Sequence, residues 1–260
     1  YFSETGQLWG NPIYRWPVMR RLGFQWWIDR FRGTFRLFDI VRVDHFRGFE
    51  SYWSVSAREK TAINGKWVKA PGRRLFRELK KSLGDLNIVA ENLGVITPEV
   101  EALRREFGFP GMAVLQFAFG SDPQAASFQP HRFERHLFAY TGTHDNDTLM
   151  GWWNGEGNST RSREQVRHEK AGARRYLGFA NEPVNWAFIR LLSASVADAA
   201  IVPMQDVLGL NGEARMNLPG NGSGNWRWRM LPGAFTPALQ AQLRDLAENY
   251  GRITKHDARE

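Results

Sequence analysis

The sequence contains no cysteine. This absence excludes disulfide bonds, thiolate nucleophiles and cysteine-ligated metal sites, and it fits the reducing cytoplasm in which we expect the protein to work. No apolar run approaches the roughly 20 residues of a membrane-spanning helix, so we expect no membrane partner. Internal repeats, low-complexity tracts and glycine-rich phosphate-binding motifs are also missing. The 260 residues, 42% of them apolar, suit a globular fold with a sizeable core.

Acidic residues are fewer than basic ones. The chain has 35 lysines and arginines against 27 acids, for a net charge of +8, which is compatible with nucleic-acid binding. The arginines are scattered, however, and the one locally basic segment, residues 161–175, also contains Glu164 and Glu169. We interpret that segment as a solvated helix face and expect no nucleic-acid partner.

A short apolar stretch, rich in β-branched residues, ends abruptly at Asp44. Its composition predicts a strand buried on both faces, as in a parallel sheet, where chemistry collects at the carboxyl ends of strands. An aspartate there can equally cap a helix or pair with a neighbour. Arg42 favours a functional role, because it precedes Asp44 by two residues and lies on the same side of the strand. A guanidinium nearby keeps a carboxylate ionised, as a covalent nucleophile requires.

Two later apolar runs end in the same way. Residues 86–90 lead to Glu91, and residues 138–140 lead through a short polar segment to His144 and Asp145. The three acids recur at intervals of roughly 50 residues, which suits one or two strand–helix units. Three such acids in succession indicate a functional edge more strongly than any one of them.

Five segments carry a resemblance that covers nearly the whole chain in order. They are residues 6–16, 42–48, 90–100, 141–148 and 215–220. They resemble the amylomaltases, the bacterial 4-α-glucanotransferases or disproportionating enzymes of glycoside hydrolase family 77. The resemblance implies an α/β fold, a (β/α)8 TIM-type barrel. Because members of the family are longer, we expect residues 1–260 to be the C-terminal part of a single catalytic barrel domain, incomplete at its N-terminus, with strands from about the third or fourth onward.

The resemblance also implies a retaining double displacement, with two carboxyl groups roughly 5 Å apart. Asp44 would attack the anomeric carbon of an α-1,4-glucan while Glu91, which must first hold a proton, protonates the departing oxygen. Glu91 would then act as base on the 4-hydroxyl of the acceptor, glucose or a maltooligosaccharide. Asp145 would hold ring hydroxyls and stabilise the developing charge. No step requires a metal or an organic cofactor.

Five more residues are expected to bind substrate by the same resemblance. Arg42, His144 and His45 flank the predicted acids, and Tyr14 and Trp16 belong to the first motif. The two aromatic side chains can stack on sugar rings or fill the core. Their residue types alone favour core packing, whereas the resemblance places them at a substrate cleft.

Two alternatives to glucan transfer stay open. Related α-amylases use the same three acids and pass the intermediate to water, so an α-glucan hydrolase or a branching enzyme is the nearest alternative. The preference for transfer depends on how loops around the cleft exclude water and hold an acceptor. A glucan-binding fragment without catalysis is the second alternative.

The remaining elements are predicted from periodicity and capping residues. A helix is expected to begin at Thr97 and Pro98, which accounts structurally for Glu99 and Glu101 and removes them from the catalytic candidates. The last predicted strand ends in Gln205 and Asp206. Other helices are expected at residues 21–32, 73–83, 161–177, 184–195 and 236–249, strands at 112–119 and 199–204, and loops at 50–72, 121–136 and 151–157.

Overall fold

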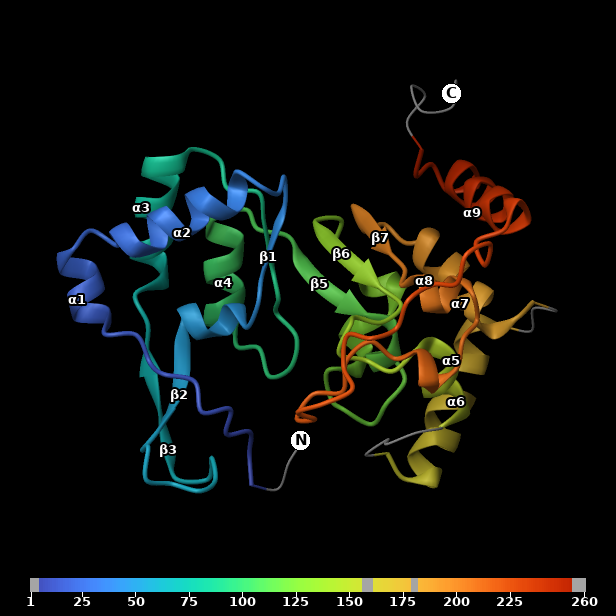
Figure 1. Ribbon diagram of the computed structural model, residues 1–260, viewed down its shortest axis with the longest axis horizontal. Helices are drawn as coiled ribbons and strands as arrows, with labels where there is room; N and C mark the ends of the chain where they lie inside the picture. Colours follow the sequence, from blue (N-terminus) through green and yellow to red (C-terminus); the bar gives the residue numbers. More distant parts are fainter. Residues whose placement is uncertain (1–4, 156–160, 179–181, 254–260) are drawn as a thin grey trace. The chain divides into compact units, whose positions relative to one another are not determined.

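The computed structural model describes residues 5–155, 161–178 and 182–253. Helices and strands both contribute to a mixed α/β structure (Figure 1). The chain divides into two compact units, Tyr1–Met112 and Ala113–Glu260, which are described in turn. Across the described ranges, no helix is both long and apolar enough to cross a membrane.

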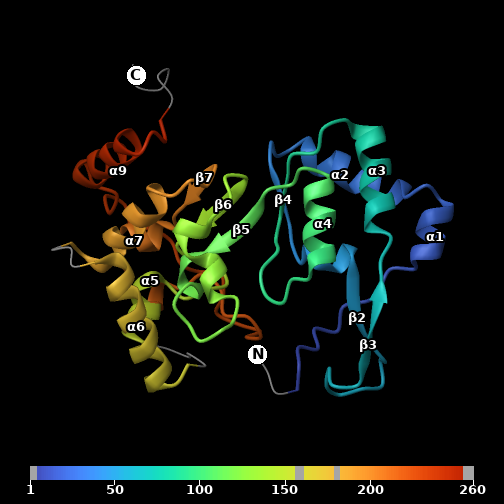
Figure 2. The same cartoon turned by 180° about the vertical axis from the view of Figure 1, so that it is seen from behind.

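A parallel strand pair forms the sheet of the first unit. β1 (Val41–Val43) pairs with β4 (Ile88–Ala90), with Val43 opposite Ala90 (Figures 1 and 2). β4 is buried throughout, as expected for a parallel sheet. The expectation of a strand buried on both faces is wrong for the stretch before Asp44. Leu37, Phe38 and Ile40 are exposed, because the strand begins only at Val41 and these residues precede it. Among the described residues, β1 has β4 as its single strand neighbour.

The predicted helix at residues 21–32 is replaced by two helices, α1 (Trp16–Arg21) and α2 (Gln25–Phe35). The backbone breaks between them because Gly23 and Phe24 both adopt positive φ angles, of 61° and 58°. Hydrophobic spacing alone does not reveal such a break. The aromatic and aliphatic positions assigned to the core are nevertheless buried, as predicted: Phe24, Trp27, Ile28 and Phe31.

Two further helices of this unit form where the sequence predicts them. α3 (Gly72–Leu83) buries Leu75, Phe76 and Leu79 completely and ends at Gly84, whose φ is 80°. α4 (Pro98–Glu106) has proline in its first position and acids in its first turn. Phe76 is the centre of an aromatic core, since its ring lies 5.2–5.5 Å from those of four other phenylalanines. These are Phe46, Phe49, Phe107 and Phe109.

Residues 50–72 are not the long loop that the sequence predicts. They contain an antiparallel hairpin of β2 (Ser51–Val55) and β3 (Gly65–Lys69) (Figure 2). Trp53 is paired with Trp67 in its register. The two indole rings meet edge to face at 5.3 Å. The hairpin follows the short 3₁₀ helix η1 (Phe46–Phe49), and the Arg47 guanidinium of that helix lies 4.0 Å from the centre of the Trp67 ring.

The sheet of the second unit has the strand order β5-β6-β7. β5 (Gly111–Val114) crosses the boundary between the units, and β6 (Leu137–Tyr140) runs parallel to β7 (Ala199–Ile201). The strand predicted at 112–119 is too long, because the chain turns at Leu115 into the 3₁₀ helix η2 (Leu115–Phe117). The strand predicted at 199–204 ends early, because Pro203 precedes α8 (Met204–Val207).

Helices account for most of the rest of the second unit. α6 (Arg163–Leu177), α7 (Val184–Ser193) and α9 (Pro237–Asn249) confirm the predictions to within a few residues. The loop predicted at 151–157 is wrong for its first part, which belongs to α5 (Leu149–Asn154), and its residues 156–157 lie outside the described ranges. α5, α6 and α7 pack against one another (Figure 1). The segment predicted as a loop at 121–136 contains only short 3₁₀ turns, η3 (Ala125–Phe128) and η4 (Pro130–Arg132), and η5 (Gly212–Ala214) follows α8.

The aromatic core of the first unit yields a stability prediction. Phe76→Ala should lower the free energy of unfolding by about 3–5 kcal/mol, because the cavity is surrounded by rings that cannot collapse into it. Phe38→Ala removes the same side chain from a position that is 59% exposed, and we expect a change within about 0.5 kcal/mol. Urea unfolding followed by tryptophan fluorescence measures both. Equal effects of the two substitutions would contradict this view of the core.

Candidate active site

Asp44 and Glu91 leave the same edge of the first sheet. Each follows directly on one member of the opposed pair Val43 and Ala90. The Glu91 amide donates a hydrogen bond of 3.0 Å to the Val43 carbonyl, which continues the ladder past the strand ends. Parallel pairing therefore brings the two predicted acids side by side, although 46 residues lie between them in the sequence. The same pairing brings the His45 amide into contact with Glu91.

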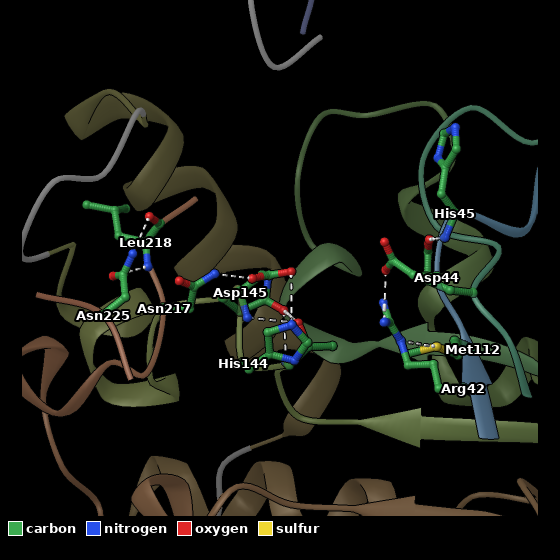
Figure 3. Close-up of polar contacts among 12 residues, drawn as sticks. Arg42, Asp44, His45, Met112, His144, Asp145, Asn217, Leu218 and Asn225 are labelled. Carbon is green, nitrogen blue, oxygen red and sulfur yellow. Dashed lines mark hydrogen bonds and ion pairs between the residues drawn. The ribbon is translucent and has the colours of Figure 1, made fainter. Parts of the chain in front are cut away.

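Arg42 pairs with Asp44, as predicted. Its Nη1 lies 2.9 Å from Oδ1 of Asp44, and its Nε lies 3.3 Å from the Met112 sulfur (Figure 3). The Asp44 side chain is 77% exposed, so its second oxygen is open to solvent. The ion pair therefore orients an accessible carboxylate, which is the arrangement that an attacking group needs.

Backbone amides hold the Glu91 carboxylate at both oxygens. Oε2 accepts a hydrogen bond of 2.7 Å from the His45 amide, and Oε1 accepts one of 2.7 Å from the Leu93 amide. His45 has a φ of 48°, a left-handed conformation that is uncommon for a residue other than glycine. Its imidazole points away from the pair of Arg42 and Asp44 (Figure 3). The backbone contact of His45 was not predicted, and substrate binding by its side chain stays a prediction.

Asn92 connects Glu91 to the helix behind it. Its Nδ2 donates to Oε1 of Glu101 at 2.7 Å, and its Oδ1 accepts from the Met112 amide at 2.8 Å. Burial alone would raise the pKa of Glu101, but hydrogen bonds from Arg104 and Asn92 outweigh it and lower the pKa below its ordinary value. Glu101 is therefore a structural acid, as predicted.

In the second unit, Asp145 lies on the loop of residues 141–148 that joins β6 to α5. Asn217 Nδ2 donates to its Oδ1 at 2.6 Å (Figure 3). Arg215 Nη2 donates to its carbonyl at 2.7 Å. His144 Nε2 lies 3.3 Å from its Oδ2. The predicted neighbours His144 and Asp145 therefore share a hydrogen-bonded cluster with two residues from the last sequence motif.

The segment around Asn217 surrounds His144 as well. The Asn217 amide donates to the His144 carbonyl at 3.1 Å, and the Trp226 ring lies 5.2 Å from the imidazole. Asn225 closes the segment, because its Oδ1 accepts from the Leu218 amide at 2.9 Å (Figure 3). Residues 217 and 221–227 line an open groove. Sequence reasoning noted the motif at 215–220 without giving Arg215 or Asn217 a role.

Asp206 is a buried acid that sequence reasoning did not single out. It is 1% exposed and accepts hydrogen bonds from the Thr141 hydroxyl at 2.6 Å and from the Leu149 amide at 2.7 Å. Burial raises the pKa of Asp206 to about 6, and the negative charge of Asp147 adds to the rise. The two hydrogen bonds lower the pKa but do not outweigh burial. The one hint in the sequence is the position of Asp206, shortly after the last strand.

The structure separates the two aromatic candidates of the first motif. Trp16 is only 8% exposed and stacks on Trp27 within the core, at 6.4 Å, so a place at an open cleft is not supported for it. Its large apolar surface is satisfied by packing against α2. Tyr14 is 37% exposed and touches Trp16, Trp26 and Trp27, so it retains a face that a ligand can reach.

The candidate site contains carboxylates and the groups that donate hydrogen bonds to them. One acid at the first sheet edge is ion-paired and exposed, and its neighbour has each oxygen on a backbone amide. Such a pair serves as nucleophile and acid–base group in retaining glycosyl transfer. Within the described ranges, no group of three or more histidine or acidic side chains is placed to hold a metal ion.

The site described so far consists of paired acids at the carboxyl ends of parallel strands in an α/β protein. Comparison with known families shows to which family the chain belongs. The sequence model of glycoside hydrolase family 77, described as 4-alpha-glucanotransferase, matches residues 1–234, and the chain belongs to that family.

Individual relatives agree with the family. The chain is 51% identical to a 4-alpha-glucanotransferase of Thermus thermophilus over 97% of its own length, and 52% identical to one of Synechocystis over 98%. The solved structure of an amylomaltase from Streptococcus agalactiae, in complex with acarbose, superposes with a TM-score of 0.89 at 39% identity over 98% of this chain. The chain spans about half the length of each of these proteins, from 49% to 50%.

The buried acid yields a prediction about its titration. Carboxyl carbon NMR should show an apparent pKa of about 6 for Asp206, and Thr141→Val should raise it further, because the lost hydroxyl stabilises the ionised form. Thr143→Val is the matched control, since that hydroxyl bonds to Asn146 instead. A pKa that is unchanged by Thr141→Val would contradict the contact.

Proposed function

We propose that the chain supplies the catalytic carboxylates of a 4-α-glucanotransferase. The reaction transfers a segment of an α-1,4-glucan to the 4-hydroxyl of glucose or of a maltooligosaccharide. The observation that supports it best is the side-by-side placement of Asp44 and Glu91 at one sheet edge, in a chain that belongs to this family. The bound acarbose of the Streptococcus relative adds support for a sugar-binding role.

In the first step, an oxygen of Asp44 attacks the anomeric carbon of the donor. A bond forms between that oxygen and the carbon, while the glycosidic bond breaks and Glu91 gives its proton to the departing oxygen. Arg42, 2.9 Å from Asp44, orients the attacking carboxylate. The products are a covalent glucosyl-enzyme and a shortened chain with a free 4-hydroxyl.

In the second step, Glu91 is ionised and removes the proton from the 4-hydroxyl of the acceptor. The acceptor oxygen displaces Asp44 from the anomeric carbon, so that two inversions keep the α configuration. The amides of His45 and Leu93 aim the Glu91 carboxylate in this step. Glu91 is protonated again at the end, ready for the next cycle.

Asp145 and His144 bind the sugar at the cleavage point in this proposal. Asn217 contacts one oxygen of Asp145, and the other oxygen lies beside His144, so the carboxylate and the imidazole present neighbouring polar atoms to the ring hydroxyls of the sugar. Tyr14 adds a contact through its exposed face, and Arg42 and His45 complete the binding residues. Trp16 contributes by packing beneath Tyr14. The steps use no metal and no organic cofactor.

We further infer that the two sheets belong to a (β/α)8 barrel of which this chain holds the strands from about the third or fourth onward. The parallel pairs β1–β4 and β6–β7 and the similarity to the Streptococcus amylomaltase support this fold. On this view residues 1–260 are part of one catalytic domain. The cytoplasmic location expected from the cysteine-free sequence stays a prediction.

Incubation with maltotriose, followed by chromatography of the products, tests the proposed reaction. The chain should release glucose and a ladder of longer maltooligosaccharides. Asp44→Asn should lower the rate by about 10³-fold or more, and Glu91→Gln by about 10²–10⁴-fold, because each removes a group that acts in the transition state. Asp39→Asn, at an exposed aspartate five residues before the nucleophile, is the matched control and should keep full activity.

Three other outcomes contradict the proposal. A net gain of reducing ends without longer products would identify a hydrolase, and new α-1,6 linkages would identify a branching enzyme. Binding of maltotriose in a calorimeter without any product would identify a glucan-binding protein.

A further inference from the structure

The loop that carries His144 and Asp145 is held at both ends by one side chain. It leaves β6 at Thr141 and enters α5 at Leu149. Asp206, on α8, accepts a hydrogen bond from the Thr141 hydroxyl with Oδ2 and one from the Leu149 amide with Oδ1. The two ends of the loop are therefore joined through a single carboxylate.

The position of Asp206 is itself fixed from a third element. Asn185, on α7, donates from Nδ2 to the Asp206 carbonyl at 2.9 Å and is buried with it. The groups that face the carboxylate from β6 and α5 are neutral, and the charged group that acts on it is Asp147, on the loop. A buried acid among neutral partners costs free energy, so simple core packing does not account for it.

We propose that Asp206 is a positioning residue, which ties Thr141 to Leu149 and thereby sets the placement of His144 and Asp145. The inference deepens the proposed function, because it rests on the assignment of those two residues to sugar binding. Asp206 touches no substrate in this role. Loss of the tie frees both loop ends, and small displacements of binding groups are costly in glycosyl transfer.

Opening of the loop that Asp206 holds depends on pH in a defined direction. When the loop is closed, burial raises the pKa of Asp206 to about 6; when the loop opens to water, the pKa returns towards its ordinary value of 3.8. Opening therefore releases a proton between these values. Opening becomes easier as the pH rises towards about 6 and levels off above it.

Hydrogen exchange tests the proposal on the intact chain. Protection factors for residues 142–149, corrected for intrinsic exchange, are measured at pH 5.0 and pH 7.5. In the unmodified protein the protection should fall by about tenfold between the two values. Asp206→Asn removes the ionisable group while keeping its size, and the difference should shrink to less than about twofold. Asp245→Asn, on α9, removes an exposed carboxylate elsewhere in the same unit and should behave like the unmodified protein.

A tenfold pH effect that persists in Asp206→Asn would overturn the proposal, as would its absence from the unmodified protein. Thr141→Val provides a second variant that removes one tie without touching the buried acid. It should lower the protection of residues 142–149 at both pH values while α6 keeps its protection. An equal loss in both segments, or no loss in the loop, would also overturn the proposal.

Activity separates this inference from the proposed function. With maltotriose as substrate, Asp206→Asn should lower kcat/KM by about tenfold, which is the cost of misplacing a binding group rather than of removing an acid. A chain that transfers no glucan refutes the proposed function, whereas the exchange result alone decides whether Asp206 holds the loop.

Discussion

The candidate acids of the first unit depend on the parallel pairing of β1 with β4. In that register Val43 stands opposite Ala90, and the next residue on each strand is the acid. A slip by one residue would send one of the two side chains to the opposite face of the sheet. The amide of His45 would lose Glu91 at the same time. Register is thus the constraint that turns two separate acids into a pair.

The two units place their acids by different means. Asp44 and Glu91 are positioned by strand ends, with Arg42 on the first acid and backbone amides on the second. Asp145 lies on a loop whose conformation depends on contacts from distant segments, Arg215 and Asn217 among them. The first arrangement is stiff because the sheet itself supplies it. The second depends on side-chain contacts that can be lost singly, which makes the loop the more adjustable part.

Local pattern was enough to predict much of the fold. α3 and α9 were predicted because apolar spacing, capping residues and a terminal glycine or proline agree within one segment. The acids at the strand ends were visible because an apolar run stops at a charge. The break at Phe24 was not predicted, because a left-handed backbone at a phenylalanine does not change the hydrophobic spacing. The β2–β3 hairpin was missed because residues 56–64 join its strands, so that the Asn64-Gly65 pair stands at the end of a long connection and not in a two-residue turn.

The unpredicted parts of the site share a physical cause. Asn217 contacts Asp145 across 72 residues of sequence, and Asp206 contacts Thr141 across 65. Such contacts depend on how strands and helices pack, which periodicity does not encode. Trp16 is a different case: its residue type favoured core packing, and its side chain does fill the core, whereas the substrate-binding role that the motif implied stays a prediction.

The contacts of Arg47 affect which parts of the hairpin can vary during evolution. Its guanidinium lies on Trp67 of the hairpin and donates to the carbonyl of Val95, on the segment that follows Glu91. The base of the hairpin is thereby bound to the neighbourhood of a candidate catalytic acid. The tip, residues 56–64, carries no such bond to that segment among the described contacts. Insertions and deletions at the tip can therefore vary the surface beside the acids while their geometry is preserved.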